Sequence, residues 1–146
     1  MHKQLTISAA LIERDEKFLL LRRVKPEHPE WHQRWEFCGG KIEPNETPLD
    51  ALHREVFEEA QLIIHSPRLL GVHTNHWNTP TGIQQTFILL YHCYAPEGEV
   101  VVKPDEHDDV FWATAEELLQ KENLLGGTEE MFQNLFLNQR QLMCQP

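Results

Sequence analysis

The stretch Gly39-Gly40-Lys41-Ile42-Glu43-Pro44-Asn45-Glu46, followed by a helical pattern over residues 47–62, decides the fold of this 146-residue chain. Thr47 is a favoured N-cap residue, and Pro48 suits the first helical position because its missing N–H would be unpaired there in any case. Asp50 places a carboxylate in the first turn, where the helix dipole favours negative charge. The sequence therefore predicts a glycine turn, a short loop and a helix that begins at Pro48.

The two sides of this helix differ in character, as a turn of about 100° per residue shows. The apolar side, which is predicted to pack on a sheet, consists of Leu49, Leu52, Val56, Phe57 and Ala60. The other side carries three carboxylates within an arc of about 100°, namely Glu55, Glu58 and Glu59. These charges repel one another, and Arg54 relieves only part of the repulsion.

This acidic side has two interpretations. A charge run on an amphipathic helix is usually a solvated surface. Alternatively, hard divalent cations such as magnesium take oxygen ligands, and a few carboxylates with phosphate oxygens and water complete an octahedron. The residues before the helix decide between these interpretations.

Gly40, five residues, Glu46, seven residues and then Arg54-Glu55-Val56-Phe57-Glu58-Glu59 resembles the signature of the Nudix hydrolases, the family of the MutT-like pyrophosphohydrolases. The fixed spacing and the loop-to-helix context make this motif specific. The preceding run, residues 35–41, is also similar to the run that leads into the motif in many members. The resemblance favours a metal site over a solvated face.

Three positions depart from the family pattern without touching an acidic residue. Gln61 stands where a glycine usually ends the helix in a left-handed conformation, which Gln adopts less readily. Asn45 replaces another common glycine, and Cys38 stands where proline is frequent.

The resemblance implies the roles of the acidic residues. Glu55, Glu58 and Glu59 are expected to hold metal ions together with a main-chain carbonyl at Gly39 or Gly40. Either Glu55 or Glu58 is expected to act as the base that activates water, with Glu55 preferred. Two residues, Arg54 and Glu46, are expected to orient the cluster. In the acidic loop 103–109, Glu106 is the first candidate for a further metal ligand or base, followed by Asp105 and Asp108.

The substrate-binding candidates lie before the helix, and they are Arg22, Arg23, Trp35, Phe37 and Lys41. The two arginines are either solvated strand-end charges or phosphate ligands, because a guanidinium offers paired donors that suit phosphate oxygens. Trp31 and Trp35 are predicted first as packing residues and second as surfaces on which a base stacks.

Local patterns predict the remaining elements. Strands are expected at 4–12 and 18–24, joined as a hairpin, and at 62–65, 69–73, 83–94, 99–103 and 110–113. Residues 25–33 and the polar stretch 75–82 are predicted loops. Thr114 and Glu117 resemble a capping box for a helix to about residue 122, and Thr128 is expected to cap a C-terminal helix. These elements indicate an α/β fold, a mixed β-sheet with helices on both faces, and the resemblance implies the same α/β/α sandwich as a single domain over residues 1–146.

Composition excludes several classes of partner. With 13 Lys and Arg against 23 Asp and Glu, the net charge is −10, which argues against nucleic acid or an anionic membrane as the main partner. The three cysteines show no paired spacing, and no signal peptide or spanning apolar run is present, so a cytoplasmic protein is expected. The nine histidines form no zinc motif.

The resemblance implies a Mg²⁺-dependent hydrolase, with Mn²⁺ as a possible substitute, that acts on a small nucleotide substrate. A nucleoside triphosphate or a nucleotide sugar is the first expectation, and ADP-ribose or a dinucleoside polyphosphate the alternative. A diphosphate isomerase and a nucleotide-binding sensor without turnover are the competing functions. Substrate identity and the choice between monomer and homodimer stay open.

Overall fold

Strand β1 (Lys3–Arg14) is the centre of the computed structural model, which describes residues 2–143 of the chain. The other strands are β2 (Lys17–Arg23), β3 (Trp35–Glu36), β4 (Cys38–Lys41), β5 (His65–Thr79), β6 (Gly82–Tyr94) and β7 (His107–Ala113). The helices are α1 (Pro48–Ala60), α2 (Ala115–Gln120), α3 (Thr128–Met131), the π-helix η1 (Phe132–Leu137) and α4 (Asn138–Met143).

The strands form one mixed sheet with the order β3-β2-β1-β6-β5, in which β4 also pairs with β1 and β7 with β2. β1 runs parallel to β6 over its length and antiparallel to its other two neighbours. Its pairing with β2 is confined to Glu13 and Arg14, whereas β4 pairs with Ile7 to Ala10. β1 therefore changes partner along its length, and this change brings β4 beside its middle. The predicted glycine turn is wrong, because Gly39 and Gly40 are paired with Ala9 and Ser8 as residues of a strand.

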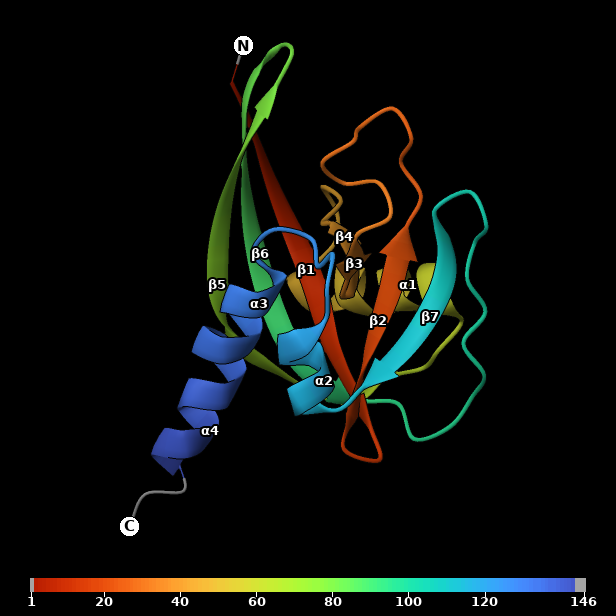
Figure 1. Cartoon of the computed structure of the whole chain (residues 1–146). Helices are drawn as coiled ribbons and strands as arrows, with labels where there is room; N and C mark the ends of the chain where they lie inside the picture. The colour runs from red at the N-terminus through yellow and green to blue at the C-terminus, as the bar shows by residue number, and fades with distance from the viewer. Residues whose placement is uncertain (1, 144–146) are drawn as a thin grey trace.

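Helices cover both faces of the sheet, with α1 behind it and α2, α3 and α4 in front of it (Figure 1). Side chains of a strand alternate between faces, and β1 contributes to two apolar clusters. Ala10 and Ile12 pack with α1, whereas Ala9 and Leu11 pack in the cluster of the C-terminal helices. Burial of such side chains stabilises the fold by about 1.5–3 kcal/mol each for the larger ones. The predicted α/β/α sandwich is confirmed.

Helix α1 begins at Pro48 as predicted, and its ends are set by local interactions. Thr47 Oγ1 accepts a hydrogen bond from the backbone N–H of Asp50, and the Asp50 carboxylate accepts one from the N–H of Thr47. At the other end Gln61 adopts φ 57° and ψ 33°, the left-handed conformation that the glycine pattern predicts. Because a side chain disfavours this conformation, Gln61 costs the helix end about 1–2 kcal/mol relative to glycine.

The predicted buried face of α1 is partly wrong. Leu49 and Phe57 are 42% and 56% exposed, whereas Ala51 and Glu59 are buried. The helix packs against both β1 and β4, so its buried stripe is rotated toward the carboxylate side. One acidic residue thus lies in the interior and not on a solvated surface.

The stretch 75–82, predicted as an exposed loop, is instead the tip of a β-hairpin formed by β5 and β6. Strand β5 continues to Thr79 and pairs with β6 from Gly82 onward. Backbone pairing with the strongly patterned β6 overrides the polar side chains, which alternate between exposed and half-buried positions. The two short strands predicted around Pro67 are one strand with a bulge between His65 and Arg68.

Three further predictions concern a strand and two helices in the second half of the chain. Residues 99–103 form no strand, although the Val101 N–H donates to the Ala60 carbonyl. The capping box of Thr114 and Glu117 is confirmed, with α2 ending at Gln120. Thr128 is the first residue of α3 and not its cap, because Gly127 occupies the N-cap position.

No helix within residues 2–143 is long and apolar enough to cross a membrane. Cys38 and Cys93 are buried free thiols, and Cys144 lies outside the described residues.

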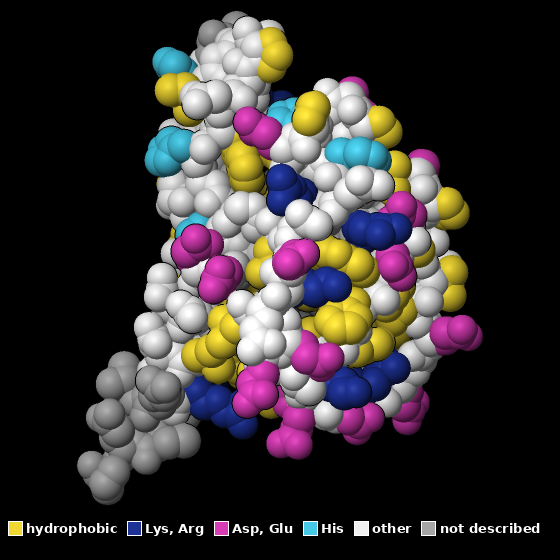
Figure 2. Space-filling view, in the orientation of Figure 1, with side chains coloured by type: hydrophobic (Ala, Val, Ile, Leu, Met, Phe, Trp, Pro, Cys, Tyr) yellow, Lys and Arg dark blue, Asp and Glu magenta, His cyan; other side chains and the backbone are white. Residues whose placement is uncertain are grey.

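On the face shown in Figure 2, Lys and Arg side chains are interspersed with Asp and Glu side chains around an apolar centre.

Candidate active site

The glycines of β4 allow the carboxylates of α1 to approach the sheet. The Gly39 N–H donates a hydrogen bond to the Glu59 carboxylate at 2.8 Å. A Cβ atom at Gly40 would lie 2.3 Å from the carboxyl carbon of Glu55, and one at Gly39 would lie 2.4 Å from the Ser8 carbonyl oxygen of β1. Only residues without a side chain fit such approaches.

Glu59 is buried between α1 and β4 and is only 8% exposed. Burial raises the pKa of Glu59 well above its ordinary value, and the negative charges of Glu36, Glu55 and Glu106 raise it further against the Gly39 hydrogen bond. Burial also raises the pKa of Glu55, although Arg54 offsets part of that effect. Several carboxylates thus crowd into one partly desolvated place.

A histidine joins this cluster. Ligand atoms of Glu59, Glu106 and His107 all lie within 4.8 Å of one another. His107 Nε2 is 2.9 Å from the Glu36 carboxylate. Because a carboxylate oxygen accepts, Nε2 is the donor in this contact, and in the tautomer protonated at Nε2 alone the Nδ1 atom carries a lone pair. Within residues 2–143 this buried Nδ1 has no hydrogen-bond partner.

These donors fit a divalent cation. Carboxylate oxygens suit Mg²⁺ and Mn²⁺, and a bound cation offsets the burial and the repulsion that together raise the pKa values of Glu55 and Glu59. The unpaired lone pair of His107 is a further candidate donor. Sequence reasoning missed His107 and Glu36 because neither belongs to the helix motif. In the structure His107, the first residue of β7, is buried, whereas Asp108 and Asp109 after it are exposed.

Arg54 ties the loop before α1 to the carboxylate cluster. Its Nε and Nη2 atoms donate to the two oxygens of Glu46 at 2.6 and 2.8 Å, and Nη1 donates to Glu55 at 2.8 Å. Nη1 also reaches Glu58 at 3.3 Å, and Nη2 the Lys41 carbonyl at 3.0 Å. One guanidinium therefore orients a loop, a strand end and two helix carboxylates.

Hydrogen bonding by Arg54 lowers the pKa of Glu46 from 4.5 to about 2. A depressed pKa in the folded state contributes stability that is present above 4.5 and is lost as the pH falls toward 2. We expect Glu46→Gln to lower the melting temperature at pH 6 and the difference from wild type to shrink as the pH falls to about 3. Thermal melts across this range check the result, with Glu43→Gln in the same loop as the exposed control. A difference that stays constant with pH would contradict the ion-pair explanation.

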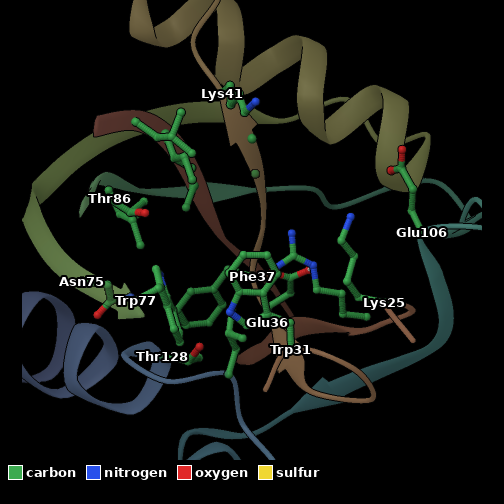
Figure 3. Close-up of a pocket in the computed structure, with 18 of the residues that line it drawn as sticks. Lys25, Trp31, Glu36, Phe37, Lys41, Asn75, Trp77, Thr86, Glu106 and Thr128 are labelled. Carbon is green, nitrogen blue, oxygen red and sulfur yellow. The ribbon is translucent and has the colours of Figure 1, made fainter. Parts of the chain in front are cut away.

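A cavity of about 640 Å³ extends from the carboxylate cluster between β1, β5, β6 and the C-terminal segment. Its aromatic walls are Trp31, Phe37 and Trp77, and the Trp31 and Trp77 rings meet edge to face with centroids 5.7 Å apart. In Figure 3 Glu106 lies at one end of this cavity and Trp77 with Asn75 at the other. The volume falls within the range of small-molecule sites.

The structure separates the predicted substrate-binding residues into two groups. Arg23, Phe37 and Lys41 line the cavity. Trp35, 8% exposed, is instead a core residue, and Arg22 stacks on it and pairs with Asp108 at 2.8 Å. Arg22 and Trp35 are cross-strand partners that share one face of the β2–β3 pair, and neither lines the cavity. The predicted contact of these two residues with substrate therefore has no support from the cavity lining and stays a prediction.

The structure places some of the predicted metal ligands in the cavity lining and others outside it. Glu55, Glu59, Glu106 and Asp105 line the cavity, together with Gly39. The Glu58 side chain is 44% exposed and lies outside this lining, beside Arg54. Asp108 is engaged by Arg22 and does not line the cavity.

Comparisons with known proteins show which sequences and folds this chain resembles. Residues 2–135 match the model of the NUDIX domain family. The chain is 32% identical over 118 residues to an Escherichia coli protein named CTP pyrophosphohydrolase, covering 81% of this chain and 82% of that protein. It is 28% identical over 128 residues to the nucleoside triphosphatase NudI of Klebsiella pneumoniae, covering 80% and 86%. The crystal structure of a MutT NUDIX hydrolase from Burkholderia pseudomallei superposes with a TM-score of 0.78 at 26% identity, covering 90% and 97%.

Proposed function

Since the chain belongs to the Nudix hydrolase family and acts on pyrophosphate bonds, we propose that its substrate is a nucleoside triphosphate, hydrolysed to a nucleoside monophosphate and pyrophosphate. One observation carries the proposal. A single cavity joins a crowded carboxylate cluster, which suits metal-bound phosphates, to a wall of aromatic side chains, which suits a base.

The names of the relatives support the choice among nucleotides. One relative is named as a pyrophosphohydrolase of CTP and another as a nucleoside triphosphatase. CTP is therefore the first substrate that we propose. Nucleotide sugars, ADP-ribose and dinucleoside polyphosphates are the competing substrates, because they contain the same diphosphate linkage.

We assign the metal ligands to Glu55, Glu58, Glu59 and Glu106, with the Gly39 carbonyl and His107 as further donors. Mg²⁺, or Mn²⁺ in its place, supplies neutralisation of the phosphate charge and a lower pKa for the attacking water. Glu55 is the proposed general base, since its carboxylate lines the cavity within the acidic cluster and can accept a proton from water there. Arg54 holds the Glu55 carboxylate in place through its 2.8 Å hydrogen bond.

The rest of the cavity is proposed to bind the nucleotide. Lys41 and Arg23 line the cavity and offer positive charge to the phosphates. Trp31 and Trp77 offer aromatic surfaces for stacking on the base. The Thr86 hydroxyl, which is buried and also lines the cavity, offers a hydrogen bond to a polar edge of the ligand.

A substrate panel tests the proposal. Nucleoside triphosphates, a nucleotide sugar, ADP-ribose and a dinucleoside polyphosphate are incubated with the chain in Mg²⁺, in Mn²⁺ and in chelator, and products are separated by ion-exchange chromatography. We expect CTP to give CMP and pyrophosphate, and chelator to lower the rate by about 10³-fold or more.

Three results would overturn parts of the proposal. Faster turnover of a nucleotide sugar, ADP-ribose or a dinucleoside polyphosphate than of every triphosphate would replace the substrate class. Turnover that persists in chelator would refute the metal-dependent chemistry. Binding of a nucleotide without any turnover would favour a sensor.

A further inference from the structure

A second cavity, of about 480 Å³, lies beyond the active site along the same strand. It is lined by Glu13, Ser66, Arg68, His92, Tyr94, Phe136 and Arg140, none of which lines the first cavity. Glu13 follows Ala9, a residue of the first cavity, by four positions on one face of β1, a distance of about 13 Å. Leu11 lies between them and is fully buried. The apolar core therefore separates the two cavities.

Two guanidinium groups from different elements line this second cavity, Arg68 from β5 and Arg140 from α4. Burial lowers the pKa of His92 at the same place, and the positive charges of both arginines lower it further against the influence of Glu13. Glu13, the acidic residue in this lining, is held by His92 Nε2 at 2.8 Å. In a chain with a net charge of −10, the described part of this lining contains two arginines and one glutamate.

A β-bulge places Arg68 in the cavity. His65 pairs with Tyr94, and the next pair along the two strands is Arg68 with His92, so β5 contains one residue more than β6 between them. Without the extra residue Pro67 would stand opposite His92, and Arg68 would point to the other face of the sheet. Ser66, inside the bulge, has φ 52°, a conformation that non-glycine residues adopt at a cost and that often marks a functional site.

We propose that this second cavity binds a phosphate monoester, with the phosphate between the guanidiniums of Arg68 and Arg140 and the organic part against Tyr94 and Phe136. Guanidinium groups donate paired hydrogen bonds that match phosphate oxygens. The volume is in the range of small-molecule sites and leaves room for more than a bare phosphate ion. The Tyr94 and Phe136 rings both line the cavity, with centroids 4.8 and 4.9 Å from that of His92, and the 43% exposed Tyr94 provides most of the apolar surface for that remainder. The proposal does not depend on the hydrolytic substrate.

Nuclear magnetic resonance of the full chain in chelator tests this site without turnover. Amide signals are followed while inorganic phosphate or CMP is added, because the two ligands separate the phosphate from the organic part. We expect saturable shifts at Ser66, Arg68, His92 and Arg140, with CMP binding more tightly than phosphate. Arg68→Gln with Arg140→Gln should weaken binding by about tenfold or more, because each charge-assisted pair is lost.

A charge-matched control and a variant that removes a negative charge from the cavity make the test more specific. Lys17→Gln with Arg34→Gln removes the same charge away from both cavities and should leave binding unchanged. Glu13→Gln keeps an acceptor for His92 and removes the negative charge, so it should tighten binding several-fold. Arg140→Glu, at an exposed position, replaces the double variant should that variant fail to fold.

The absence of saturable shifts around the bulge up to about 20 mM ligand would overturn the proposal, since millimolar binding is visible in that range. Equal weakening in the double variant and its charge-matched control would overturn it as well. Shifts confined to residues of the first cavity, such as Lys41 and Trp31, would assign the binding to the active site. Equal affinity for phosphate and CMP would refute the monoester.

Discussion

Glu59→Gln is expected to lower kcat/KM for the preferred nucleotide by about 10³-fold, which corresponds to about 4 kcal/mol of transition-state stabilisation. The same substitution should leave the melting temperature of the metal-free protein unchanged or higher. Glu59 is proposed to hold metal, and an amide in its place carries no charge to do so. The oxygen of that amide can still accept the hydrogen bond that the Gly39 N–H donates at this position.

The sign of the stability effect follows from the pKa of Glu59, which the fold raises well above 4.5. A raised carboxyl pKa contributes stability that is present below 4.5 and is lost as the pH rises through the raised value. At neutral pH the metal-free wild type therefore carries a buried charge or holds a proton at a cost. Glutamine does not titrate, so the stability of the metal-free variant relative to that of wild type should increase as the pH rises.

Steady-state kinetics with Mg²⁺ and thermal melts in chelator at pH 5 and pH 8 check both parts. Glu116→Gln, at an exposed position of α2, is the matched control and should behave as wild type. Addition of Mg²⁺ should raise the melting temperature of wild type and of the control more than that of Glu59→Gln. A variant that melts several degrees lower in chelator and loses activity in proportion would show that Glu59 is structural.

Substitution of the two adjacent glycines of β4 should have different consequences. Gly40→Ala is expected to lower kcat/KM by about 10²-fold with little loss of stability, because its methyl group displaces the Glu55 carboxylate and a shift of about 1 Å suffices for such a loss. Gly39→Ala is expected to destabilise the fold by about 1–3 kcal/mol, because its methyl group meets the backbone of β1. Moving the Glu55 side chain costs less free energy than moving the backbone of β1, which is paired in the sheet.

Urea unfolding and steady-state kinetics on the two alanine variants separate these effects, and each variant is the other's control. Chelator is included in the unfolding experiment so that metal binding does not contribute to stability. If Gly40→Ala unfolded as readily as Gly39→Ala, the close approach of Gly40 to Glu55 would be a packing contact only. Full activity in Gly40→Ala would remove Glu55 from the proposed machinery.

The sequence alone determined the parts of this protein that depend on neighbours along the chain. The start of α1 follows from Thr47, Pro48 and Asp50, and the start of α2 from Thr114 and Glu117, because a capping box needs only residues three positions apart. The spacing from Gly40 to Glu59 likewise identified the family, since it lies within one loop and one helix.

Tertiary structure decided what depends on which strands pair and which faces they bury. Polar residues 75–82 became a hairpin because β6 supplied backbone partners, and Trp35 went to the core while Glu36 turned to the cavity. His107 joined Glu59 and Glu106 only because β7 pairs with β2 and begins where the Glu59 side chain of α1 lies. Local patterns specify the elements, but long-range pairing and burial specify which side chains meet, and no spacing along the chain encodes that meeting.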